Sequence, residues 1–181
     1  AGGVVTSTNL VGGTANKVIF GFTFNAPYTI TSPSVQPKVQ KFTISFNQPT
    51  TGVFFNMKVV ESTNGTYSSG LPDVTSIGAA PLTQPTPKDL LVDFSSSPRD
   101  LQANPNLTYF LIVDIDPTAS GATPAMQVSL VDGGFGTTTN NNITIVGGAP
   151  ANLDKASSSA SVFGQTYTFA SIFPPTLTSS Y

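Results

Sequence analysis

The sequence contains no cysteine, histidine or tryptophan and only one glutamate, Glu61. These absences remove the thiol nucleophile, the soft metal ligands and the side chain that most often moves protons near neutral pH. Only 9% of the 181 residues are charged. The inventory predicts a structural or adhesive protein rather than an enzyme.

Positive charge is also scarce. Seven Lys and Arg residues are spread along the chain, and the formal net charge is −2. Nucleic acids and anionic membranes are bound by clustered cations, so we expect neither as a partner. The longest apolar run, residues 107–115, is of strand length and far short of the roughly 18–20 residues of a membrane span, which predicts no membrane span.

Apolar and aromatic residues are abundant by contrast. They make up 39% of the chain and include 13 Phe and 5 Tyr, so low charge does not here mean disorder. The length suggests one domain with a sizeable core.

Apolar residues alternate with polar ones through most of the chain, which is typical of half-buried β-strands. Residues 18–24 and 42–46 alternate most clearly, and in residues 53–59 the pattern places Val53, Phe55, Met57 and Val59 inward. Shorter runs occupy residues 90–94, 126–131, 142–146 and 161–169. With turns rich in Gly, Pro and Asn between them, these segments predict an all-β, antiparallel β-sandwich of immunoglobulin-like or jelly-roll topology.

Two segments depart from simple alternation. Residues 107–115 are apolar on both faces, which indicates a strand covered on both sides or one whose outer face meets a partner. Residues 68–88 contain four prolines and predict an irregular excursion packed over one end of the sandwich. We therefore divide the chain into a β-prone segment (1–14), the sandwich domain (15–169) and a tail (170–181).

The order of these segments resembles the β-sandwich repeat modules of very large bacterial secreted surface proteins and adhesins. The resemblance spans residues 15–170 and is carried by Val18-Ile-Phe-Gly-Phe-Thr-Phe24, Val39-Gln-Lys-Phe-Thr-Ile-Ser-Phe46, Phe55-Asn-Met-Lys-Val59, Leu107-Thr-Tyr-Phe-Leu-Ile-Val-Asp-Ile-Asp116 and Ala122-Thr-Pro-Ala-Met-Gln-Val128. It implies a strut or adhesive module without catalytic residues. The proline-rich excursion and the tail depart from that family.

Both ends of the chain suggest self-assembly. A β-prone terminus is either an edge strand of its own domain or a strand donated to a neighbouring subunit, which would build a filament or tube. The predicted interface residues lie in the first segment, at off-pattern positions and in the tail: Val4, Val5, Leu10, Val11, Phe54, Phe110, Phe173 and Pro174. Copies of the chain are the expected partner. The alternative is an adhesive module that binds a glycan or another surface protein through its loops.

Acidic side chains at strand ends are candidate calcium ligands, because Ca²⁺ takes six to eight oxygen ligands. Asp114 and Asp116 occupy alternate positions, and Asp132 is a further candidate. Solvated or turn-bound carboxylates are the alternative. A glycosidase role for the pair is disfavoured, since no Glu or His lies nearby to tune protonation.

Sequons and the amino terminus bear on location. Asn64 and Asn142 lie in turn-like sequons and are the predicted glycosylation sites if the producing cell has that machinery. The sequence begins Ala-Gly-Gly, as after removal of a signal peptide, and its charge-poor composition is common among exported surface layers. We expect an extracellular or cell-surface protein.

Overall fold

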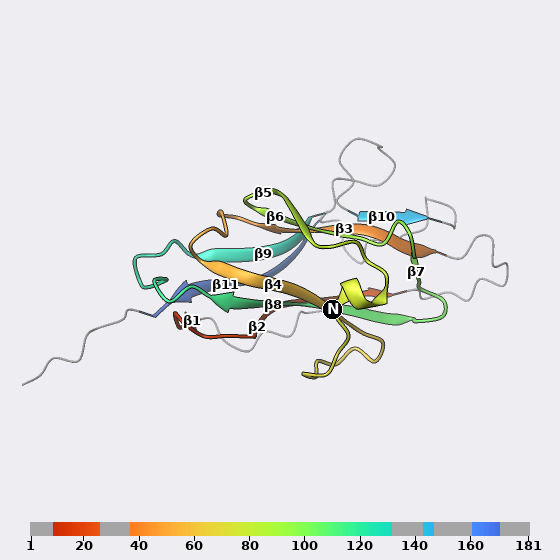
Figure 1. Cartoon of the computed structure of the whole chain (residues 1–181), viewed down its shortest axis with the longest axis horizontal. Helices are drawn as coiled ribbons and strands as arrows, with labels where there is room; N and C mark the ends of the chain where they lie inside the picture. Colours follow the sequence, from red (N-terminus) through yellow and green to blue (C-terminus); the bar gives the residue numbers. More distant parts are fainter. Residues whose placement is uncertain (1–8, 26–36, 132–142, 147–160, 171–181) are drawn as a thin grey trace, which may run out of the picture.

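The computed structural model describes residues 9–25, 37–131, 143–146 and 161–170, which form a β-sandwich of two sheets (Figure 1). The smaller sheet has the order β2 (Lys17–Asn25), β8 (Asn106–Ile115), β4 (Phe54–Ser62). The larger sheet runs β1-β11-β9-β3-β6-β5, and β10 and β7 also pair with β3. Its strands are β1 (Asn9–Leu10), β11 (Ser161–Phe169), β9 (Met126–Val131), β3 (Lys38–Phe46), β6 (Asp89–Asp93), β5 (Thr83–Thr86), β10 (Ile143–Val146) and β7 (Arg99–Asp100). The predicted all-β sandwich is confirmed.

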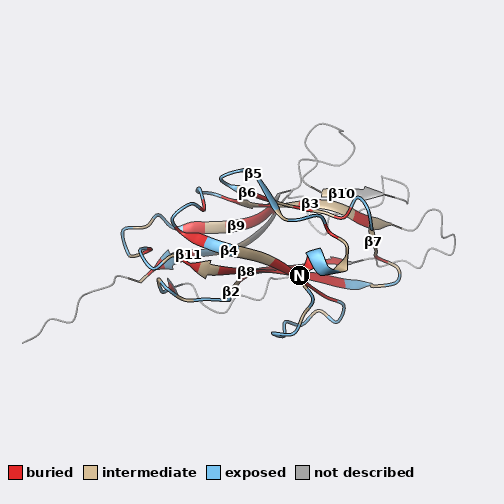
Figure 2. Cartoon of the chain, in the orientation of Figure 1, coloured by how far each residue is buried: buried red, intermediate tan, exposed pale blue. Residues whose placement is uncertain are grey.

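The core lies between the sheets and is rich in aromatic rings. In β3 the predicted alternation holds, since Phe42, Ile44 and Phe46 are buried and face the smaller sheet. The ring of Phe42 contacts that of Phe22 from β2 at 5.3 Å and that of Tyr109 from β8 at 4.8 Å between centroids. Figure 2 shows the resulting pattern, with buried stretches along the strands and exposed residues at the turns.

Strand β8 is the centre of the smaller sheet and is buried on both faces, as its sequence predicts. Its outer-facing Phe110 and Ile112 form a second apolar cluster with Val60 of β4. The ring of Tyr67 lies edge-on to Phe110, with centroids 5.5 Å apart. The segment after β4 therefore covers the part of this outer face around Phe110.

A glycine makes room for the buried outer ring. A Cβ atom on Gly21 of β2 would lie 2.8 Å from a carbon of Phe110, closer than such atoms approach. Phe110 was predicted to be an exposed interface residue, and that prediction is wrong, because Gly21 and Tyr67 together enclose its ring at 1% exposure.

The proline-rich excursion is more ordered than its sequence suggests. It contains a short 3₁₀ helix, η2 (Val74–Ile77), and strand β5, which pairs with β6. Asp73 caps η2 by accepting from the Thr75 backbone N–H, and Gly78 ends it with a φ of 107°. Within the described residues, no helix has the length and apolar character needed to cross a membrane.

Strand β4 reverses the face expected for two phenylalanines. Alternation placed Phe55 in the core and left Phe54 off-pattern as an interface residue, but Phe54 is 5% exposed and Phe55 43%. A β-bulge shifts the register against β8 between Phe55 and Lys58, and Asn56 within it has a φ of 47°. One extra residue changes the phase of the alternation, so the two rings exchange faces.

Two residues of the first segment, Asn9 and Leu10, form a short strand that pairs within its own chain. Asn9 and Leu10 of β1 pair in parallel with Thr168 and Phe169 of β11, and the Leu10 side chain is 1% exposed. Leu10 is thus a core residue of the folded chain, as the edge-strand alternative requires. Neighbouring Val11 is 54% exposed, the largest exposure among the large apolar side chains described.

Candidate functional site

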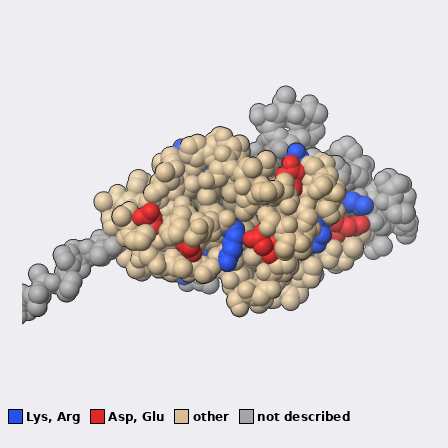
Figure 3. Space-filling view, viewed as in Figure 1, with Lys and Arg blue, Asp and Glu red and all other residues tan. Residues whose placement is uncertain are grey.

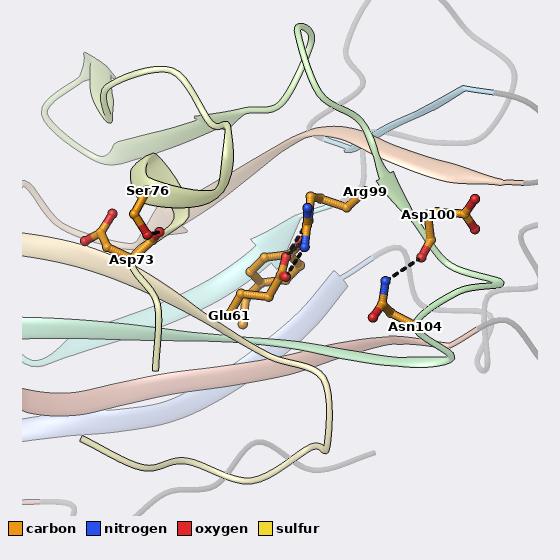
Figure 4. A network of polar contacts seen from close by, with 7 residues as sticks. Glu61, Asp73, Ser76, Arg99, Asp100 and Asn104 are labelled. Carbon is orange, nitrogen blue, oxygen red and sulfur yellow. Dashed lines mark hydrogen bonds and ion pairs between the residues drawn. The ribbon is translucent and has the colours of Figure 1, made fainter. Parts of the chain in front are cut away.

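The sequence has one glutamate and one arginine, and the fold pairs them. Glu61 points from β4 into the sandwich, where the Arg99 side chain, from β7 of the opposite sheet, donates through Nε to Oε2 at 2.9 Å and through Nη2 to Oε1. The hydroxyl of Tyr109 donates to Oε2 at 2.9 Å. Figure 4 shows Glu61 and Arg99 meeting between the sheets. It also shows two turns, one closed by a hydrogen bond from the Ser76 hydroxyl to the Asp73 carbonyl and the other by a hydrogen bond from the Asn104 side-chain amide to the Asp100 carbonyl.

The Glu61 carboxylate at the centre of this network is buried and hydrogen-bonded. Glu61 is 3% exposed, and no buried side-chain nitrogen or oxygen among the described residues lacks a hydrogen-bond partner. The hydrogen bond to Glu61 raises the pKa of Arg99, while burial and the Glu61 charge raise the pKa of Tyr109. The three side chains connect the two sheets at one end of the sandwich.

Two buried tyrosines make stability sensitive to high pH. Burial raises the pKa of Tyr167 to about 12, and its hydroxyl donates to the Ile19 carbonyl; the pKa of Tyr109 is raised as well. In the unfolded chain both hydroxyls ionise near the ordinary value of 10.0.

We therefore expect stability to fall above pH 10. A tyrosine whose pKa is raised in the folded state makes its full contribution to stability below the pKa that it has in the unfolded chain. Above that pKa the contribution is lost as the pH rises, by about 1.4 kcal/mol per pH unit for each tyrosine. Urea unfolding between about pH 8 and pH 11 measures this, and Tyr167→Phe should reduce the slope. An unfolding free energy that stays constant to pH 11 would contradict it.

An exposed polar arrangement surrounds Asp114 at the other end of β8. Its Oδ1 accepts from the backbone N–H of Asn16 at 2.7 Å, and its Oδ2 accepts from the Asn56 side-chain amide at 2.8 Å. Lys58 donates from Nζ to Oδ1 of Asn16 at 2.8 Å. The bond from Asn16, followed by that from Asn56, lowers the pKa of Asp114, so the carboxylate is charged at neutral pH.

Both asparagines hold a backbone conformation that is uncommon outside glycine. The φ angles are 52° at Asn16 and 47° at Asn56, and these are the only positive values among the described non-glycine residues. Asn tolerates this region better than most residues do. Two strained positions thus converge on one carboxylate, an arrangement that often marks a functional site.

An aromatic ring lies beside this carboxylate. Phe55 is directly opposite Asp114 in the β4–β8 register, so both side chains project from the outer face of the smaller sheet. We call Phe55, Asp114, Asn16, Asn56 and Lys58 the Phe55 patch. Sequence reasoning found Asp114 but missed Phe55, because the bulge that turns it outward has no clear signal beyond an asparagine after it.

The two predicted calcium ligands that the structure describes, Asp114 and Asp116, bond to different partners. Asp116 follows β8, and its Oδ1 accepts from the backbone N–H of Thr118 at 2.8 Å and from the Thr118 hydroxyl; these bonds lower its pKa. Asp132 lies outside the described residues. The described ranges contain no cluster of three or more His, Cys, Asp or Glu side chains that could hold a metal ion. Calcium binding remains a prediction.

Of the remaining predicted residues, the structure describes Asn64 and leaves five outside the described part of the chain. Asn64 is exposed in the turn after β4, where its Oδ1 accepts from the backbone N–H of Thr66 at 3.0 Å. Five further predicted residues lie outside the described part of the chain: Val4, Val5, Asn142, Phe173 and Pro174.

On the face shown in Figure 3, a few acidic and basic side chains are scattered among neutral ones, and neither kind forms a patch. Comparison of the chain with known proteins gave no match to a family model, a curated protein or a solved structure.

Proposed function

We propose that this chain is a structural subunit of an extracellular filament, tube or surface assembly, in which the first residues of one copy complete the larger sheet of the next. One observation carries the proposal, the outer edge of β11. On its inner edge β11 pairs with β9 from Ser161 to Tyr167, whereas on the outer edge the described residues supply only the two-residue β1, opposite Thr168 and Phe169. Such an edge can receive a further strand, because the backbone N–H and C=O groups along a sheet edge are a template for pairing with another chain.

The length and direction of the first segment match this edge. Because β1 runs parallel to β11, residues before Asn9 that continued the strand would run along β11 toward Ser161. A strand rises about 3.3 Å per residue, so residues 1–8 would span about 26 Å, close to the length of residues 161–167. Their sequence, with Val4 and Val5 among small and hydroxyl side chains, suits a strand.

Exchange between copies requires an anchor and a hinge, and both are present. Leu10 supplies the anchor, since it is buried against the core beside β11. Gly12 and Gly13 follow it, and Gly13 has a φ of 80°. If these two residues extend instead of turning, the same Leu10 contacts form in a neighbouring copy, as in domain swapping.

A disulfide between β1 and β11 should link different copies. The chain has no cysteine, so Asn9→Cys with Thr168→Cys, a register pair, introduces the only thiols. After oxidation of the purified assembly, we expect a ladder of covalent oligomers on a non-reducing gel. Thr43→Cys with Leu91→Cys, a register pair between β3 and β6, is the matched control and should give only single chains.

Removal of residues 1–8 tests the same proposal without cysteines. The shortened chain keeps Leu10 and should stay folded but monomeric by light scattering, whereas negative-stain microscopy of the full chain should show ordered polymers. The same assay with and without Ca²⁺ tests the predicted role of Asp114, Asp116 and Asp132. Disulfides confined within single chains, or a full chain that stays monomeric, would contradict strand exchange.

An adhesive module is the second candidate, and the Phe55 patch is the observation that favours it. Phe55 is 43% exposed and lies next to the Asp114 carboxylate, whose orientation is fixed by hydrogen bonds from Asn16 and Asn56. The two candidate functions use different residues, so one protein can both assemble and bind a ligand.

A further inference from the structure

We propose that the Phe55 patch binds one ring of a neutral saccharide. This inference specifies the ligand of the adhesive candidate and is independent of strand exchange, because the patch lies on the outer face of the smaller sheet and strand exchange uses the edge of β11. It rests on three properties of the patch: its aromatic surface, its oriented polar groups and its small size.

The aromatic surface suits the apolar face of a sugar. A pyranose ring with mostly equatorial hydroxyls presents several C–H bonds on one face, and these pack on the electron-rich face of an aromatic ring. Phe55 is the exposed member of the Phe54–Phe55 pair, and the bulge at Asn56 holds it outside the core.

The polar groups suit the rim of hydroxyls around such a ring. A carboxylate can accept about four hydrogen bonds, and each Asp114 oxygen receives one of the two protein bonds described above. Each oxygen therefore keeps one further position that can accept a hydrogen bond from a sugar hydroxyl. The Lys58 ammonium gives one of its three N–H bonds to Asn16 and can donate to a hydroxyl oxygen.

The size of the patch favours a sugar over a protein partner. A stable protein interface buries roughly 800 Å² on each side, whereas a fully accessible aromatic side chain supplies about 150–250 Å² and Phe55 is 43% exposed. The other large apolar side chains exposed in the described ranges are Val11 and Tyr67. The ring of Tyr67 already packs on that of Phe110. A single ring matches a single sugar unit.

Saturation-transfer difference NMR on the full-length chain tests this proposal, because it observes the small ligand whether or not the protein polymerises. The probes are the methyl β-glycosides of glucose, galactose and N-acetylglucosamine and methyl α-mannoside, each at up to about 20 mM. We expect at least one to bind with a dissociation constant of about 1–10 mM, with saturation strongest on the C–H protons of one ring face.

Two variants of the patch and one control locate the site. Phe55→Leu keeps an apolar side chain but removes the ring, and Asp114→Asn places an amide where two N–H donors point; each should weaken binding at least tenfold. Tyr67→Leu removes the other exposed aromatic ring and should leave binding unchanged. Absence of saturation for all four glycosides, or binding that survives Phe55→Leu, would overturn the proposal. A change in assembly with Phe55→Leu in the absence of sugar binding would overturn it in favour of a contact between copies.

Discussion

Replacing Arg99 with methionine is expected to lower the free energy of unfolding by about 3 kcal/mol, the lower end of what breaking a buried ion pair costs. The substitution keeps much of the side-chain volume but leaves the carboxylate of Glu61, at 3% exposure, with only the Tyr109 hydroxyl as a partner. The lower end applies because the Arg99 side chain is 23% exposed, so water can approach the pair. Urea unfolding monitored by circular dichroism measures the loss.

The double variant Glu61→Leu with Arg99→Met separates the pair from its surroundings. Buried ion pairs replaced by apolar residues of similar volume often leave stability unchanged, so the double variant should be more stable than Arg99→Met alone. Tyr109→Phe serves as the milder control, because it removes one hydrogen bond to Glu61 and keeps both bonds from Arg99. A loss below about 1 kcal/mol in Arg99→Met would show that the Glu61 carboxylate does not depend on its partner.

Replacing Phe42 with alanine should cost about 3–5 kcal/mol, the range found when a buried aromatic ring is removed. The ring is fully buried at the centre of the interface between the sheets, where it contacts Phe22, Phe24, Phe94 and Tyr109. The rings of Phe22, Phe24 and Tyr109 belong to strands of the smaller sheet, which limits their collapse into the space. In a domain with about 5–15 kcal/mol of total stability this is a large share.

Phe55→Ala is the matched control for this substitution. It makes the same chemical change at a ring that is 43% exposed on the outer face, and it should cost less than about 1 kcal/mol. Chemical denaturation of both variants gives the comparison, with equal slopes expected if both unfold in two states. A loss of about 3–5 kcal/mol in both variants would show that Phe55 is buried and has been assigned to the wrong side of its sheet.

The fold class follows from the sequence because a repeating pattern encodes it. Phe42, Ile44 and Phe46 alternate with polar residues and become the buried face of β3, and residues 107–115, which are apolar on both faces along most of their length, become the central strand of the smaller sheet. In both cases the pattern repeats over a whole strand, so one irregular residue does not obscure it.

The candidate site was predicted only in part. Asp114 was predicted because it lies at a strand end, at an alternate position to Asp116. Its neighbours Asn16 and Asn56 are 98 and 58 positions away in the sequence, and no local pattern relates them to it. Phe55 was placed inward, because the alternation of residues 53–59 continues smoothly through a bulge that only pairing with β8 creates.

The sequence by itself determined that this is a charge-poor, all-β chain with an aromatic core, since composition and the period of two are local properties. Tertiary structure alone decided that the one glutamate meets the one arginine, that Phe110 is covered while Phe55 is exposed, and that β1 pairs with β11. The physical reason is the same in each case: strand register and sheet order join residues far apart in the chain, and a shift of one residue moves a side chain from the core to the surface.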